Sequence, residues 1–583
     1  MKPLHSPYRL RSLSWVGLTV YSAIISADAQ MTINRVITDG SLVPDRGDYV
    51  KSFSLENTGF ATLTGVSVTV NLSSPNALNP MWFGDMFASL THGTASENER
   101  MAVLFNRPGV SAQDPWGDSS SSLSQAYDVS GALAGDWLPS NRWSLLVSDS
   151  QQGGIARVDS LSLTLTGSLA ESGEAVFRPG DTVSGGGVVS GQVNLTSTSP
   201  TASVAATIGE ADSLHFGGGM VGTANLVKDG RGELVIGRPN RGGGAGALGV
   251  PSNNDYSGEI EVSEGSLRLV GNNALGSGAR IKLGGGGVEL RLDEDTAVSN
   301  AVTLVAASTL SKVQVSSGGA SISSGMQGAG GFEKSGAGTL TIGGTNTYEG
   351  VTRVSSGTLK VSGAITQSDV TVAGNARLSL TSSGNLGGDV VVQEGAALGG
   401  LGTFSGNVTV QGVHSPGNSP GLQTATAGLT YGSSARVEWE LFSNTAAASA
   451  LGISYDAIEI TGGSLLINAG AVIDLSFSDP AGTANPVTST VNWANSFWSS
   501  NQSWQMIKLS GMGVFDSTTS AFTIGTIGND ASGVAFATAR PGSSFTASNL
   551  ADGVYINYVI PEPSSALLGG LASLLLLRRR PVA

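Results

Sequence analysis

The chain has 583 residues, of which 40% are hydrophobic and 13% are charged, with 83 glycines and no cysteine. Its formal charge of −14 argues against a nucleic-acid partner, because phosphate binding requires a basic face. The lack of cysteine excludes a disulfide framework, and short runs of Val, Leu and Ile between Gly and Asn turns predict an all-β protein.

The first 29 residues have the organisation of a secretory signal peptide. A basic segment that begins at Lys2 precedes a mostly apolar stretch, Leu13 to Ser26. Ala27 and Ala29 then place small residues where signal peptidase requires them, so cleavage is predicted before Gln30. We therefore expect the mature chain to be exported.

Residues 30–167 are predicted to form a β-sandwich. Apolar and polar residues largely alternate from Gly65 to Leu72 and from Trp143 to Asp149, as they do in half-buried strands. Leu161 to Leu165 adds a third such strand, and Gly, Pro, Asn and Asp cluster in the intervening turns.

Several segments of this region resemble the P/homo-B domain that follows the catalytic domain of proprotein convertases. They are Trp82 to Met86, Leu90 to Thr94, Arg107 to Gly109, and the strands around Trp143 and Leu161. The resemblance implies a jelly-roll-like sandwich. It does not imply a peptidase, because the chain has four scattered histidines and no catalytic domain precedes this region, whereas a triad needs a positioned base beside a nucleophile. His92 is expected to be a hydrogen-bonded turn residue.

The same resemblance raises one candidate cofactor, calcium, because some related domains bind it. Asp85 and Asp149 are the candidate oxygen ligands. Carboxylates at strand ends are more often solvated or turn-forming, so both interpretations stay open.

Residues 168–480 are predicted to form a β-helix because they contain an internal repeat. Residues 226–237 align with 332–343, and 254–269 align with 346–361, with a Gly-rich insertion at 238–251 in the first copy. Each copy supplies short strands that cannot bury their apolar face alone, so stacking must complete the core. The copies, near 226–269 and 332–361, resemble the autotransporter-associated β-strand repeat, which implies a right-handed parallel β-helix.

Residues 481–558 are expected to cap the open end of this β-helix, because an exposed last coil would present unpaired edges. The region contains the aromatic residues Trp493, Phe497, Trp498 and Trp504. An alternative is that these aromatic side chains form a platform for stacking glycans.

Residues 559–583 have the order of a sorting signal. Pro561, Glu562 and Pro563 precede an apolar run at 566–577 and a basic cluster of Arg578, Arg579 and Arg580. This run reaches roughly 18 Å as a helix, short of the ~30 Å hydrocarbon core, and the arginines should stay cytoplasmic. The tail resembles the PEP-CTERM signal, which implies cleavage near the triplet by an exosortase, a membrane protease. An ordinary membrane anchor is the alternative.

A carbohydrate-active enzyme is the main alternative for the β-helix, since parallel β-helices also serve as lyases and hydrolases. Glu438 and Glu440 flank Trp439 and should point to the same side of a strand, about 7 Å apart, as a carboxylate pair would. A solvent-facing strand shows the same pattern.

Together these features predict a non-enzymatic cell-surface or extracellular-matrix protein. We expect signal peptidase and an exosortase-like protease to process it, with transient anchoring in the inner membrane through 566–577. The expected role is adhesion or association with extracellular polysaccharide or a neighbouring cell surface, with the sandwich presented on a β-helix stalk.

Overall fold

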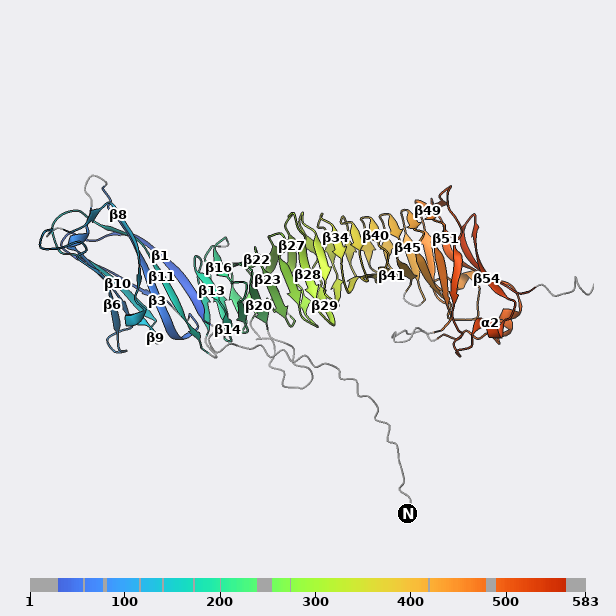
Figure 1. The fold of residues 1–583 in the computed structure, drawn as a ribbon, viewed down its shortest axis with the longest axis horizontal. Helices are drawn as coiled ribbons and strands as arrows, with labels where there is room; N and C mark the ends of the chain where they lie inside the picture. The colour runs from blue at the N-terminus through green and yellow to red at the C-terminus, as the bar shows by residue number, and fades with distance from the viewer. Residues whose placement is uncertain are drawn as a thin grey trace, which may run out of the picture.

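The computed structural model describes residues 30–561, except 56–57, 77–80, 115–116, 139–140, 171–173, 200, 238–253, 273, 418–419 and 479–488. The molecule is elongated, with a two-sheet unit at the N-terminal end, stacked coils along the long axis and an antiparallel unit at the C-terminal end (Figure 1). Strands dominate the described residues, which confirms the all-β prediction. The helices found there are short: α1 (Ser130–Leu133), α2 (Phe536–Ala539), and the 3-10 helices η1 (Phe83–Asp85), η2 (Ala448–Ala450) and η3 (Ser496–Ser499).

The N-terminal unit consists of two antiparallel sheets with one core. The first sheet has the order β1 (Met31–Leu42), β11 (Arg157–Leu169), β3 (Phe60–Ser73), β8 (Ser122–Asp128), with β9 (Gly135–Asp136) also on β3. The second has the order β2 (Asp48–Ser54), β10 (Arg142–Asp149), β5 (Met86–His92), β6 (Arg100–Asn106); β4 (Met81–Trp82) pairs with β7 (Ser119–Ser120). Trp143, Leu145 and Val147 of β10 are buried in the core, as their alternation predicted. The jelly-roll connectivity stays a prediction.

The coils that follow form a parallel β-helix with three faces, which confirms the predicted architecture. The first face contains β13 (Thr182–Gly185), β16 (Ser203–Thr207), β19 (Asn225–Asp229), β22 (Glu259–Val262), β24 (Arg280–Leu283), β27 (Ala301–Leu304) and β30 (Met326–Gln327), and then β33 (Thr345–Asn346), β36 (Ala364–Ile365), β39 (Asn385–Leu386), β42 (Thr403–Phe404), β45 (Leu422–Ala425), β48 (Ala457–Ile460) and β51 (Gln502–Leu509).

The second face is a single 14-stranded sheet. It contains β14 (Gly187–Val189), β17 (Ser213–Phe216), β20 (Glu233–Gly237), β23 (Ser266–Val270), β25 (Glu289–Leu292), β28 (Ser311–Val315), β31 (Phe332–Ser335), β34 (Thr352–Val354), β37 (Val370–Val372), β40 (Val390–Val392), β43 (Val408–Val410), β46 (Leu429–Tyr431), β49 (Ser464–Ile467) and β52 (Val514–Phe515).

The third face contains two sheets. The first has β12 (Ala175–Phe177), β15 (Val193–Leu195), β18 (Met220–Gly222) and β21 (Asp255–Tyr256), and the second has β26 (Ala297–Val298), β29 (Gly319–Ile322), β32 (Thr339–Ile342), β35 (Thr358–Val361), β38 (Arg377–Leu380), β41 (Ala397–Gly400), β44 (Val413–Pro416), β47 (Arg436–Glu440), β50 (Val472–Ser476) and β53 (Thr523–Ile527).

Inward-facing side chains of neighbouring coils stack directly on one another. On the first face, Leu226 aligns with Ile260, then with Ile281 and then with Val302, and all four are at most 1% exposed. Burying each such side chain contributes about 1.5–3 kcal/mol, so the coils are stabilised only when they are stacked.

The two repeat copies occupy different faces of the β-helix. Residues 226–237 form β19 and β20 on the first and second faces, whereas residues 332–343 form β31 and β32 on the second and third. The repeat is therefore a local strand, turn and strand unit, and it is not tied to one side of a coil. The predicted insertion at 238–251 lies outside the described residues.

The sandwich and the β-helix share one continuous sheet. Strand β1 pairs antiparallel with β11 on one side and with β13 on the other, through Met31 to Asn34 against Thr182 to Gly185. Arg35 of β1 also donates to Asp181 through two nitrogens, at 2.8 and 2.5 Å, and both side chains are buried. This junction was not predicted from the sequence.

The C-terminal unit closes the last coil around an aromatic core. Strand β51 pairs antiparallel with β55 (Gly553–Val559), which pairs with β54 (Ser544–Leu550). Trp493, Trp498 and Trp504 are at most 1% exposed, and Phe497 is partly buried against them. The alternative prediction of a glycan-stacking platform is therefore wrong, because buried rings have no face free for a ligand.

Candidate functional site

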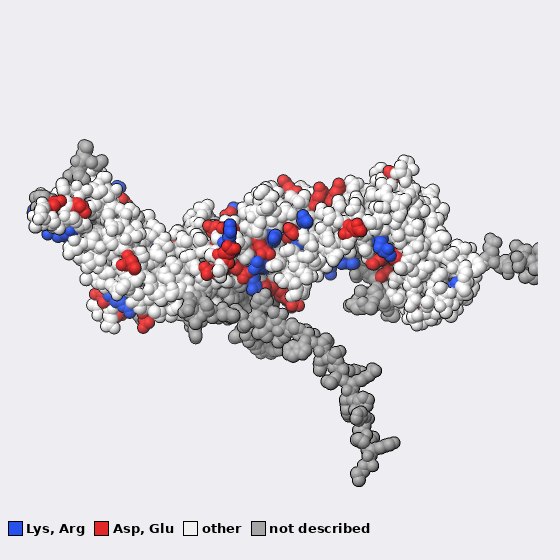
Figure 2. Space-filling view, viewed as in Figure 1, with Lys and Arg blue, Asp and Glu red and all other residues white. Residues whose placement is uncertain are grey.

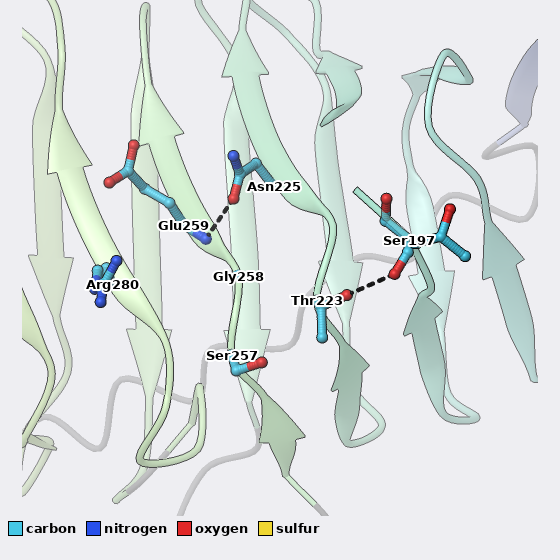
Figure 3. A pocket seen from close by; sticks show the side chains of 8 residues that line it. Ser197, Thr223, Asn225, Ser257, Gly258, Glu259 and Arg280 are labelled. Atoms are coloured by element: carbon cyan, nitrogen blue, oxygen red, sulfur yellow. Dashed lines mark hydrogen bonds between the residues drawn. The ribbon is translucent and has the colours of Figure 1, made fainter. Parts of the chain in front are cut away.

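A polar groove of about 460 Å³ lies at the corner between the third and first faces of the β-helix (Figure 3). Four successive coils contribute to it. Ser197 follows β15, Thr223 lies between β18 and β19, and Ser257 lies between β21 and β22. The other lining residues are Thr198, Gly258, and the first residues of β19, β22 and β24, which are Asn225, Glu259 and Arg280.

Hydrogen bonds between coils fix the walls of this groove. The hydroxyl of Thr223 donates to the carbonyl of Ser197 at 3.0 Å, and the side-chain oxygen of Asn225 accepts from the backbone N–H of Glu259 at 3.0 Å (Figure 3). The corner itself requires glycine at 258, because a Cβ there would lie 2.4 Å from the carbonyl oxygen of Ala224. Contacts between neighbouring coils therefore shape the groove.

The groove combines hydroxyl, amide, carboxylate and guanidinium groups with no aromatic or aliphatic lining. Glu259 and Arg280 contribute opposite charges, so the lining is neutral overall. Charged side chains gather over the middle of the molecule, whereas the visible face of the C-terminal unit carries few (Figure 2). Such a surface can donate and accept hydrogen bonds, but it contains no paired acid and base for proton transfer.

The predicted calcium ligands, Asp85 and Asp149, lie at one end of the sandwich and are each 5% exposed. Burial raises the pKa of both carboxyl groups, and the carboxylates of Asp45 and Asp85 raise the pKa of Asp149 further. Oδ1 of Asp85 is buried without a hydrogen-bond partner. Across the described ranges, however, no three acidic or histidine side chains converge as for a metal ion, so these residues supply only part of the six to eight oxygens that calcium prefers. Calcium binding by these residues stays an untested alternative to a turn-forming role.

Glu438 and Glu440 face outward from β47 on either side of buried Trp439, as predicted. Glu438 accepts a hydrogen bond from the hydroxyl of Ser415 at 2.6 Å, and its partner residue on the next coil is Asp474, which is bound to Arg436. Glu438 is thus engaged by a hydroxyl of the preceding coil on an outward face of the β-helix, and the enzyme alternative gains no support from this arrangement.

Two histidines of the described residues, His92 and His414, are buried. His92 lies in strand β5, where its ring stacks on Trp143 with a centroid distance of 4.1 Å, and neither ring nitrogen has a hydrogen-bond partner. The prediction that it is a hydrogen-bonded turn residue is therefore wrong. His414 is buried inside the β-helix, where Nε2 donates to Oε1 of Gln423 at 2.6 Å and Nδ1 accepts from the hydroxyl of Tyr431 at 2.8 Å.

Two buried lysines were missed by the sequence analysis. Lys228 and Lys334 occupy the same position in the two repeat copies, and neither is exposed. Each ammonium group donates to three backbone carbonyls, those of Asp229, Gly230 and Glu264 in the first copy and of Ser335, Gly336 and Ser356 in the second. Burial lowers the pKa of both to about 8. A lysine recurring at one aligned position in a chain with few charges was the available signal.

Most predicted processing residues lie outside the described residues. These are Ala27, Ala29, Glu562, Pro563, the apolar run 566–577 and the cluster Arg578, Arg579 and Arg580. Pro561 is the last described residue, and it is exposed just after β55 ends at Val559. In the part of the chain that the structure describes, no helix has the length and apolar character needed to span a membrane.

Comparison with known families identifies the second repeat copy. Residues 332–361 match the Passenger-associated-transport-repeat family, which supports the predicted autotransporter-associated repeats. The match and the parallel β-helix together indicate an autotransporter-like passenger domain, which is typical of exported proteins. Proteins with this repeat are generally non-catalytic, and no enzymatic activity is established for the chain. No curated protein matches the sequence.

Two solved structures share limited similarity with the chain. One is dimeric latent PorU from Porphyromonas gingivalis, with 9% identity and a TM-score of 0.17, covering 24% of this chain and 13% of that chain. The other is the Agl-KA catalytic domain, with 8% identity and a TM-score of 0.18, covering 76% of this chain and 97% of that chain. The chain thus spans about an eighth of the PorU length, and neither similarity informs function.

Proposed function

We propose that the protein is a non-enzymatic, exported cell-surface or extracellular-matrix protein that presents its sandwich on a β-helix stalk and associates with extracellular polysaccharide or a neighbouring cell surface. The observation that carries this proposal is the passenger repeat at 332–361, which lies within a long parallel β-helix. The elongated shape of the molecule (Figure 1) suits a protein that displays a terminal unit at a distance from its attachment point.

The junction between the two units supports a presenting role. Because β1 belongs to both the sandwich and the first face of the β-helix, the sandwich is held by backbone hydrogen bonds on both sides of that strand. The buried pair of Arg35 and Asp181 crosses the same junction. A rigid stalk keeps its terminal unit at a fixed distance from the point of attachment.

In this proposal the two ends of the chain direct export and sorting. Signal peptidase removes residues 1–29, and 566–577 holds the chain transiently in the inner membrane until an exosortase-like protease cuts near Pro561. The position of β55 supports this order, because the strand ends at Val559 and a cut after it would leave the C-terminal unit intact. The PEP-CTERM and P/homo-B resemblances belong to the same proposal.

The experiment is surface labelling of the native host with antibody to the full-length protein, combined with co-sedimentation of the secreted protein with extracellular polysaccharide from that host. We expect labelling of intact cells or matrix and co-sedimentation with the polysaccharide. The proposal would be contradicted if the antibody labelled cells only after the outer membrane was permeabilised, and if all the protein stayed in the supernatant of the co-sedimentation assay.

A further inference from the structure

Arg280 differs from three other outward-facing cations on its own strand and on the neighbouring second face. Lys282 contacts Glu261 at 3.0 Å, Arg268 contacts Asp293 at 2.8 Å, and Arg291 contacts Glu233 at 2.9 Å. Arg280 lies in register with Glu259 on the adjacent strand. Nevertheless, the described residues include no ion pair for either Arg280 or Glu259, and both of these side chains line the polar groove.

The charges that remain in the groove cancel each other. One carboxylate and one guanidinium sit among the hydroxyls of Ser197, Thr198, Thr223 and Ser257. A polyanion would meet the Glu259 carboxylate locally and the formal charge of −14 at longer range. A metal ion would find a single carboxylate, and a protein partner would find no apolar anchor.

A neutral sugar fits this chemistry best. Sugar hydroxyls both donate and accept hydrogen bonds, the guanidinium of Arg280 offers several donors in a fixed plane, and the Glu259 carboxylate offers acceptors only. Lining groups come from four successive coils spaced about 4.8 Å apart, so the groove follows the long axis of the β-helix and can accommodate a short run of sugar units.

We propose that this groove is a binding site for a neutral polysaccharide, in which Arg280 donates to sugar hydroxyls and Glu259 accepts from them. The inference rests on the proposed function and names the ligand class of that function. The groove has no aromatic ring for stacking, so affinity for a single short oligosaccharide is weak, and a long polymer offers the groove many equivalent segments.

The test is affinity gel electrophoresis of the full mature protein in gels that contain a neutral polymer, either dextran, galactomannan or xyloglucan, or an anionic polymer, either alginate or chondroitin sulfate. The variants are Arg280→Ala and Glu259→Gln. The matched control is Lys282→Ala, which removes a cation two residues further along the same strand, outside the groove.

We expect at least one neutral polymer to retard the wild-type protein, Arg280→Ala to weaken that retardation at least tenfold, and Glu259→Gln to weaken it severalfold. Lys282→Ala should migrate like the wild type. The proposal is overturned if no neutral polymer retards the wild type, if only the anionic polymers do, or if Arg280→Ala behaves like Lys282→Ala. In that last case the protein still associates with polysaccharide, and only the groove is excluded as the binding site. The proposed function is tested separately, because it would be refuted if the protein did not reach the cell surface.

Discussion

The buried pair of Arg35 and Asp181 should control how tightly the sandwich is held to the β-helix. The guanidinium donates through Nε and Nη2 to the two carboxylate oxygens, and the side chains are 7% and 1% exposed. Removing one partner of a buried pair costs about 3–5 kcal/mol, because the remaining charge stays desolvated. We therefore expect Arg35→Met to lower the free energy of opening the β1 and β13 pairing by about that amount.

Native-state hydrogen exchange is the suitable assay, since a long solenoid does not unfold in one two-state step. A loss of 3–5 kcal/mol corresponds to roughly 10²- to 10⁴-fold faster exchange in peptides from β1 and β13. The control is Arg157→Met, which removes a half-exposed cation from a pair on the neighbouring strand β11 and should cost at most about 1 kcal/mol.

The double variant Arg35→Met with Asp181→Leu provides a second check. It removes both charges, together with the buried Nη1 of Arg35, which has no hydrogen-bond partner. We expect it to recover a large part of the loss, although Oδ2 of Asp181 also accepts from the backbone N–H of Arg178 and that contact would be lost. If Arg35→Met exchanges no faster than Arg157→Met, the ion pair does not hold the junction and this reasoning is wrong.

Three further predictions concern the interior of the β-helix and the C-terminal unit. Lys334→Met should destabilise the repeat at 332–361 by about 3 kcal/mol, because three backbone carbonyls lose their donor; a change below about 1 kcal/mol in hydrogen exchange would contradict this. Burial lowers the pKa of His414 from 6.5 to about 4, so its contribution to stability is complete above pH 6.5 and is lost as the pH falls towards 4. The free energy of opening the coils around His414, measured by native-state hydrogen exchange, should therefore drop by about 2 kcal/mol more between pH 7 and pH 5 in the wild type than in His414→Gln, and equal drops would refute the assignment. Trp498→Ala should cost the C-terminal unit about 3–5 kcal/mol by emptying part of the aromatic core, as native-state hydrogen exchange in peptides from β51, β54 and β55 would show, and exchange at the wild-type rate would be inconsistent with its burial.

The β-helix could be predicted because its signals are local. Alternating apolar residues and glycine turns recur within each repeat copy, and the second copy, residues 332–361, is the segment that matches a known repeat family. The strands of the sandwich were equally visible, since Trp143, Leu145 and Val147 alternate with polar residues whatever their partners are.

What could not be predicted depends on contacts between distant residues. The pairing of β1 with β13 joins segments about 150 residues apart, and nothing in β1 distinguishes it from an ordinary edge strand. The face on which each repeat lies depends on the number of strands between the two copies. This number could not be predicted, because the coils between residues 270 and 330 are irregular. The groove is lined by Ser, Thr, Asn and Gly with one Glu and one Arg, all from four successive coils, and any solvated loop has a similar polar composition.

The central claim is that this chain is exported, cut near Pro561 and retained outside the cell as an intact β-structure. Intact-mass analysis of the mature protein from its native host, combined with cell fractionation, tests it most directly. The account predicts an N-terminus at Gln30, a C-terminus near Pro561, and protein in the surface or extracellular fraction. A chain that still ends at Ala583 and fractionates with the inner membrane would contradict it.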